Sequence, residues 1–303
     1  MLATKESVAK LSIFAVSLLI VMKVVASIVT GSIAIRADAV HSTIDLFGVI
    51  IGYIGIRISG KPPDEQHAFG HGKAENIASA VIAGLILIAA GTIAYQAITR
   101  LIVGGVLELV TLGIYVTAAA IAINGIISWY ALRVARSTDS LALEATARDM
   151  FADVLSSGAV LVGLILVRLT GITLLDPIVA LLVAIIIART AILTLKKSFG
   201  GLMDIKLPQA EEEEIITCIA EHGGNVVAFH ELRTRKAGSQ RYIDLHLVMP
   251  RNASVEEAHL MCDHLEQDIE SRLPNTNVTI HVEPCTIECE QCSVSCTLRK
   301  KSY

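Results

Sequence analysis

The sequence predicts a membrane protein with six transmembrane helices, followed by a small α+β domain. Three observations support this fold class. The 303 residues are 53% hydrophobic and only 18% charged, whereas about 25% of the residues of a soluble domain are charged. Long apolar stretches fill the first 200 residues. Of the 29 acidic residues, 12 lie in residues 1–200 and 17 in residues 201–303, so the last third has the composition of a soluble domain.

Six apolar stretches account for the first two thirds of the chain. A helix needs about twenty apolar residues to cross a hydrocarbon layer of ~30 Å. The stretches are separated by Gly, Pro and Ser/Thr-rich breaks, which end helices. They cover residues 9–30, 33–58, 75–100, 106–132, 144–169 and 174–195. We therefore expect residues 1–200 to form a six-helix transmembrane domain.

The positive charges indicate how these spans are oriented. An even number of spans places both termini on one side of the membrane. Most Lys and Arg residues of the loops fall on that side: Lys5, Lys10, Lys61, Lys73, Arg133, Arg136, Lys196 and Lys197. The other side has little more than Arg100 and Arg168. Because an excess of Lys and Arg marks the cytoplasmic side, we expect both termini and the last domain in the cytoplasm.

Two of the predicted spans contain ionisable residues at helical spacing. His41 and Asp45 are four residues apart in the second span, and Asp149 and Asp153 are four apart in the fifth. Residues four apart share a helix face. A charge at the membrane centre costs roughly 2.5–3.5 kcal/mol, so these acids need a compensating cation or proton. One imidazole nitrogen and three carboxylate oxygens suit a tetrahedral divalent metal.

The loop between the second and third spans offers a second candidate metal site. Asp64, His67 and His71 follow one another at spacings of three and four residues. The alternative is that these are ordinary polar residues near a membrane face. For the acids within the spans, the alternatives are a position at helix ends in water, or pairing with Lys23 and Arg148.

These motifs together resemble the cation diffusion facilitator family, in particular its zinc and ferrous-iron efflux branch. They read His41-xxx-Asp45, Asp64-xx-His67-xxx-His71-Gly72-Lys73-Ala74-Glu75 and Asp149-xxx-Asp153. The resemblance implies a homodimer of six-span protomers in a prokaryotic cell membrane. It also implies a ferredoxin-like cytoplasmic domain and the export of divalent metal in exchange for protons.

By position, the resemblance assigns residues to two sites and a hinge. The transport site is His41, Asp45, Asp149 and Asp153, the loop site is Asp64, His67 and His71, and the hinge charge pair is Lys73 with Asp204. The close branch commonly has Asp at position 41 and His at position 149. A single His favours zinc or iron(II) over manganese, and the Irving–Williams order favours zinc over iron(II) at equal geometry.

The sequence of residues 205–288 predicts a domain with the order helix, strand, strand, helix, strand. The helices are expected at 209–222 and 253–273, and the strands at 225–234, 240–249 and 277–283. Alternating apolar residues support the strands, and this order gives a small α+β fold. The resemblance implies a cytoplasmic metal-binding dimerisation domain with a site of His230, His246, His259, His281 and Glu283. The alternative for each His is a solvated surface position.

All six cysteines lie in this last third. Disulfides are disfavoured in the cytoplasm, so we expect Cys218 and Cys262 to be small buried residues. The other four, Cys285, Cys289, Cys292 and Cys296, have the spacing Cys-x3-Cys-x2-Cys-x3-Cys. Clustered thiolates of this kind bind zinc or an iron–sulfur cluster. The alternative is that residues 289–303 form a mobile tail.

The sequence therefore predicts a secondary active transporter and not an enzyme. The expected activity is proton-coupled export of Zn²⁺ or Fe²⁺ by a homodimer in the lipid bilayer, with the metal also serving as a structural or regulatory ligand. The net charge of −4 argues against a broad nucleic-acid-binding surface. No Gly-rich phosphate-binding loop is present, so ATP is not the expected driver. A membrane-anchored metal sensor and a passive divalent-metal channel remain as alternatives.

Overall fold

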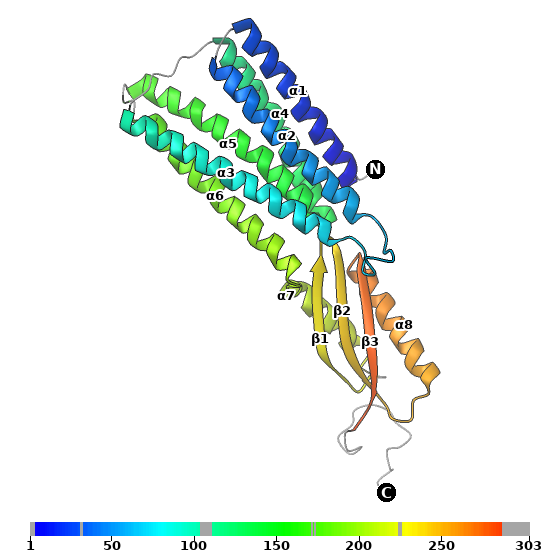
Figure 1. Cartoon of the computed structure of the whole chain (residues 1–303). Helices are drawn as coiled ribbons and strands as arrows, with labels where there is room; N and C mark the ends of the chain where they lie inside the picture. The colour runs from blue at the N-terminus through cyan, green and yellow to red at the C-terminus, as the bar shows by residue number, and fades with distance from the viewer. Residues whose placement is uncertain are drawn as a thin grey trace. The chain divides into compact units, whose positions relative to one another are not determined.

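The structure, a computed structural model, describes residues 4–30, 33–103, 111–170, 172, 174–223 and 226–286. The side chains of some residues inside the helices, His41 among them, also lie outside what it describes. The chain divides into two compact units, Met1–Leu202 and Met203–Tyr303. The first unit is helical, and the second combines two helices with a sheet (Figure 1).

Long helices make up the described part of the first unit. They are α1 (Lys5–Thr30), α2 (Ile33–Ser59), α3 (Lys73–Val103), α4 (Thr111–Thr138), α5 (Leu141–Thr170) and α6 (Leu175–Leu202). Among the described residues, four segments are long and apolar enough to cross a membrane: Lys5–Ala26, Lys73–Ile102, Thr117–Thr138 and Pro177–Leu202. These belong to α1, α3, α4 and α6. Helices α2 and α5 are as long, with 27 and 30 residues, and they carry the ionisable residues noted above.

The helices of this unit pack around α5. Helix α5 contacts α2, α3, α4 and α6, while α3 lies along α6, and α1 lies against α2 and α4. Glycines on α2 permit the closest approaches. A Cβ added at Gly52 would lie 2.2 Å from Thr146 Oγ1 of α5, and one at Gly55 would lie 2.4 Å from Ala78 Cβ of α3. Small residues let helix backbones approach in this way, so α2 is held close to both neighbours.

A buried carboxylate joins one end of four helices. Glu75, in the first turn of α3, is fully buried. Its Oε1 accepts hydrogen bonds from Lys5 Nζ at 2.5 Å and Ser59 Oγ at 3.0 Å, and its Oε2 accepts one from Ser140 Oγ at 2.7 Å. Ser140 immediately precedes α5. Glu75 therefore ties α1, α2, α3 and the start of α5 together.

The second unit is a three-stranded sheet with two helices against one face (Figure 1). Its elements are α7 (Gln209–Glu221), β1 (Ala228–Ala237), β2 (Gln240–Met249), α8 (Val255–Arg272) and β3 (Thr276–Pro284). The strands have the order β1-β2-β3, with β1 antiparallel and β3 parallel to β2. The expected order of helix, strand, strand, helix, strand is present, so this unit is a small α+β domain.

The two faces of β2 have different environments. Ile243, Leu245 and Leu247 point into the core and are at most 1% exposed, packed with residues of α7 and α8 such as Ile219 and Leu265. The residues between them, His246 included, lie on the opposite face, because successive strand residues point to opposite sides. That second face is therefore available for polar chemistry.

An ion pair fastens α7 to this sheet. Arg241 of β2 donates two hydrogen bonds to Glu211, from Nε at 2.8 Å and Nη2 at 3.0 Å, and a third to the carbonyl of Pro274 at 3.0 Å. The guanidinium hydrogen bonds hold the pKa of Glu211 below its usual range. This pair joins the first turn of α7, the second strand and the loop before β3.

Candidate metal sites

A cavity of about 220 Å³ in the helical unit collects the three predicted intramembrane acids. Asp45 of α2 and Asp149 and Asp153 of α5 all line it. Apolar residues of α3 and α6, with the hydroxyl residues Thr92 and Ser156, form much of the remaining wall. The cavity thus presents three carboxylates among apolar side chains.

Close packing of α2 on α5 accounts for this convergence. A Cβ added at Gly48, one turn after Asp45 on α2, would lie 3.0 Å from Asp149 Oδ2. The missing side chain leaves room for both carboxylates at one cavity. His41 is one turn before Asp45 on the same helix, but its side chain lies outside the described residues. Its role as a fourth ligand therefore stays a prediction.

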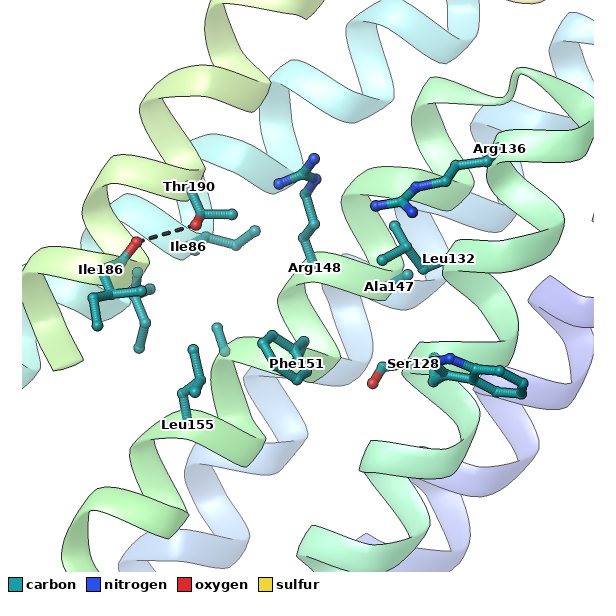
Figure 2. A pocket seen from close by; sticks show the side chains of 13 residues that line it. Ile86, Ser128, Leu132, Arg136, Ala147, Arg148, Phe151, Leu155, Ile186 and Thr190 are labelled. Atoms are coloured by element: carbon teal, nitrogen blue, oxygen red, sulfur yellow. Dashed lines mark hydrogen bonds between the residues drawn. The ribbon is translucent and has the colours of Figure 1, made fainter.

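The nearest arginine on α5 is engaged elsewhere. Arg148 donates to Glu144 Oε1 from Nε at 3.1 Å and from Nη2 at 2.6 Å, and it lines a different cavity, between α4 and α6 (Figure 2). Lys23 of α1 donates to Ser42 Oγ at 2.7 Å. Three carboxylates in a nonpolar cavity repel one another and are poorly solvated, which favours groups that offset their charge.

The loop between α2 and α3 brings its three predicted ligands together. Asp64 Oδ1 lies 3.4 Å from His67 Nδ1, Asp64 Oδ2 lies 3.4 Å from His71 Nε2, and the two imidazole rings are 4.5 Å apart. Gly70, with φ of +76°, makes the turn that folds residue 71 back on residue 67. Backbone N–H groups of His67 and Gln66 donate to Asp64 and lower its pKa.

One histidine of this loop has an unsatisfied nitrogen. His71 Nδ1 is buried and has no hydrogen-bond partner among the residues that the structure describes. Ligand atoms of Asp64, His67 and His71 all lie within 4.8 Å of one another. A carboxylate kept ionised and two imidazoles at this separation can hold a divalent cation.

The outer face of the sheet carries the second cluster of histidines. His230, His246 and His281 are paired in register across β1, β2 and β3. Glu283, two residues after His281, accepts hydrogen bonds from His230 Nε2 and His246 Nδ1, both at 3.0 Å. These hydrogen bonds hold the pKa of Glu283 below its usual range, the one from His230 contributing most. His281 Nε2 is 3.8 Å from the same carboxylate.

The remaining predicted residues lie apart from these clusters. His259 is exposed on α8, where it pairs with Asp263 at 3.5 Å. Lys73 donates to the carbonyl of Leu202 at 3.4 Å, and Asp204 pairs with Arg235 at 3.5 Å. The Lys73–Asp204 pair would join the two units and stays a prediction. Cys285 is a half-buried free thiol, and Cys289, Cys292 and Cys296 lie outside the described residues.

One further group of ligand types was not expected. Cys218, His222 and Asp268 place ligand atoms within 4.8 Å of one another. His222 contacts the Cys218 carbonyl through Nδ1 at 2.9 Å and Asp268 through Nε2 at 3.1 Å. Burial raises the pKa of the Cys218 thiol, and a neutral thiol is a poor ligand. Both ring nitrogens of His222, at the C-terminal end of α7, are therefore already engaged by oxygen atoms.

Comparison with known proteins agrees with this arrangement. The family described as cation efflux transmembrane domain matches residues 9–203, and the one described as cation efflux protein, cytoplasmic domain, matches residues 207–285. An uncharacterized transporter of Synechocystis sp., sll1263, is 35% identical over 263 residues, 87% of this chain and 85% of the relative. The cation-efflux pump FieF of Cronobacter sakazakii is 34% identical over 271 residues, 89% of this chain and 90% of the relative.

A solved structure offers a local match. It is of CzrB in its zinc form. It shares 40% sequence identity with this chain, covers 26% of this chain and 90% of its own, and gives a TM-score of 0.25.

Proposed function

The chain belongs to the cation efflux, or cation diffusion facilitator, family, and we propose that it exports Zn²⁺ or Fe²⁺ in exchange for protons, as a homodimer. Membership makes it an integral membrane transporter of divalent metal cations rather than an enzyme. The observation that carries the finer proposal is the convergence of Asp45, Asp149 and Asp153 on one cavity between helices. A helix bundle that only anchored a sensor would have no use for three such acids.

In this proposal the metal binds to the three carboxylates and to the imidazole of His41. Oxygen ligands alone suit hard cations, and one nitrogen shifts the preference toward zinc or iron(II). Helices α2 and α5 then cross the membrane with the other four, and their ionisable residues face the cavity and not lipid. The relative named FieF is described as a cation-efflux pump, which is consistent with metal export.

Proton exchange follows from the charge of the empty cavity. Three carboxylates this close cannot all stay ionised in a nonpolar environment, so some bind protons when the metal leaves. A metal ion must displace these protons, because carboxylate and imidazole bind metal in their deprotonated forms. If the cavity opens alternately to the two sides, metal moves outward as protons move inward.

The two other clusters take auxiliary roles in the proposal. The loop cluster, Asp64 with His67 and His71, holds a metal at the proposed cytoplasmic side. The sheet cluster, with Glu283 between His230 and His246, holds zinc in the cytoplasmic domain and stabilises the dimer. In both clusters the metal replaces the hydrogen bonds and close contacts between histidine and carboxylate side chains that already lie near one another.

Metal flux into proteoliposomes tests the proposal. Zinc, iron(II), manganese and cadmium are compared with and without an imposed proton gradient, for the wild type and for Asp153→Asn. Asp244→Asn is the matched control, because this carboxylate is exposed on β2. We expect gradient-dependent zinc or iron flux that Asp153→Asn abolishes and Asp244→Asn leaves intact. Flux without gradient dependence would indicate a channel, and no flux in the wild type would indicate a sensor.

A further inference from the structure

A second cavity, of about 360 Å³, lies in the helical unit and is lined by residues of α3, α4, α5 and α6. Its lining is mostly apolar, with two arginines, Arg136 of α4 and Arg148 of α5. Figure 2 shows both guanidinium groups at one end of the cavity and Phe151, Leu155 and Ile186 farther along it. The cavity, called the α4–α6 groove below, therefore has a cationic end and an apolar end.

The cationic end carries more positive than negative charge. Glu144 is shared by Arg148 and by Lys197 of α6, whose Nζ lies 3.3 Å from Oε1. Arg136 is exposed and has no hydrogen bond or ion pair within the part of the chain that the structure describes. Arg133, one turn before Arg136, lies over the ring of Trp129, 5.8 Å from its centroid. Two arginines and no carboxylate are among the described residues that line this cavity, so its cationic end suits an anion.

The position of the groove along the helices matches the edge of a membrane. Arg136 is two residues from the end of α4, and Arg148 is seven residues into α5, which is about 10 Å along the helix. Trp129 is 62% exposed, and Trp is enriched where lipid headgroups meet the tails. Phe151 and Ile186 are 50% and 52% exposed. They continue the apolar surface along the helices, away from the arginines.

We propose that the α4–α6 groove binds one anionic phospholipid. Its phosphate lies between Arg136 and Arg148, and one acyl chain follows Phe151, Leu155 and Ile186. Arginine recognises phosphate with paired hydrogen bonds, and basic pockets between transmembrane helices select anionic headgroups. A second copy of the chain is a poorer occupant, because a two-fold contact centred here would bring the arginines of both copies together.

Lipid binding to the full-length protein in neutral detergent tests this inference. Native mass spectrometry compares phosphatidylglycerol with phosphatidylcholine of the same chains. We expect about tenfold tighter binding of phosphatidylglycerol to the wild type, and loss of this preference in Arg136→Gln/Arg148→Gln. Arg57→Gln is the matched control, since Arg57 is an exposed arginine in the last turn of α2, outside the groove, and it should keep the preference.

Two further variants and one further ligand make the result decisive. Arg136→Gln alone should reduce the preference without risk to folding, because its side chain is exposed. Leu155→Trp should fill the groove and weaken binding of both lipids. Equal binding of the two lipids by the wild type, or an unchanged preference in the arginine variants, would overturn the inference. The melting temperature of the protein is also compared with phosphatidylglycerol and with inorganic phosphate. If inorganic phosphate raised it as much as the lipid does, the inference would be overturned, since a free anion would then suffice.

Discussion

Replacing Glu75 should destabilise the helical unit more than replacing any exposed carboxylate. Its buried side chain accepts hydrogen bonds from Lys5, Ser59 and Ser140. Glu75→Gln can keep all three contacts, because the amide oxygen accepts from Lys5 and Ser59 and the amide nitrogen can donate to Ser140 Oγ. It removes only the charge. Glu75→Ala removes the contacts as well and leaves a cavity.

The expected magnitude follows from this difference. A hydrogen bond to a charged group contributes about 1.5–3 kcal/mol, and a neutral one about 0.5–1.5 kcal/mol. Three bonds that each lose about 1 kcal/mol give about 2–3 kcal/mol for Glu75→Gln, with the Lys5 share reduced because the lysine side chain is 25% exposed. Glu75→Ala should cost about 3–5 kcal/mol, the range for breaking a buried ion pair.

Unfolding in mixed micelles of increasing SDS content, followed by circular dichroism, measures these free energies. Glu65→Gln is the control, because Glu65 is exposed in the loop before α3, and its unfolding midpoint should match the wild type. A cycle with Lys5→Met should show coupling between positions 5 and 75 of at least about 0.5 kcal/mol. An unchanged midpoint for Glu75→Ala, or strict additivity in the cycle, would refute the role assigned to this carboxylate.

Three other outcomes are expected. Gly52→Ala, whose Cβ would meet Thr146 Oγ1 at 2.2 Å, should cost about 1–3 kcal/mol of stability and slow metal flux, whereas Gly84→Ala, with open space around its Cβ, should do neither. The lowered pKa of Glu211 contributes stability that is present above its unfolded pKa near 4.5 and lost as the pH falls through the folded value. Glu211→Gln should therefore weaken the loss of stability at acid pH. The melting temperature of the second unit, followed by circular dichroism at a series of pH values, measures this. Glu283→Gln should abolish the rise in melting temperature that zinc, by mass action, gives the wild-type protein; an equal rise in both would place zinc elsewhere.

Sequence spacing predicted those parts of the sites that lie within one helix, strand or loop. The four-residue spacing on α5, and the three- and four-residue spacings of the loop, identify side chains that the structure does bring together. The alternation along β3 placed His281 and Glu283 on one face. In each case the relevant contacts are local, so helix or strand geometry determines them.

Contacts between distant elements could not be predicted in this way. The register that aligns His230 with His246 and His281 depends on strand pairing, which alternation alone does not set. The cluster of Cys218 and His222 needed Asp268 from another helix. Within the described residues, hydropathy selects spans in α1, α3, α4 and α6.

Helix α5 connects the two cavities of the helical unit. Its consecutive residues Arg148 and Asp149 line different cavities, the arginine the α4–α6 groove and the carboxylate the acid-lined cavity. Ile86, Ala152 and Ile187 line both, so they form a common wall one side chain thick. Protein interiors are closely packed and compress little, so a displaced helix shifts the side chains that it contacts. A movement of α5 that changes access to Asp149 should therefore change the shape of the groove as well. By the same contacts, a lipid bound in the groove should alter how easily α5 moves during the proposed transport step.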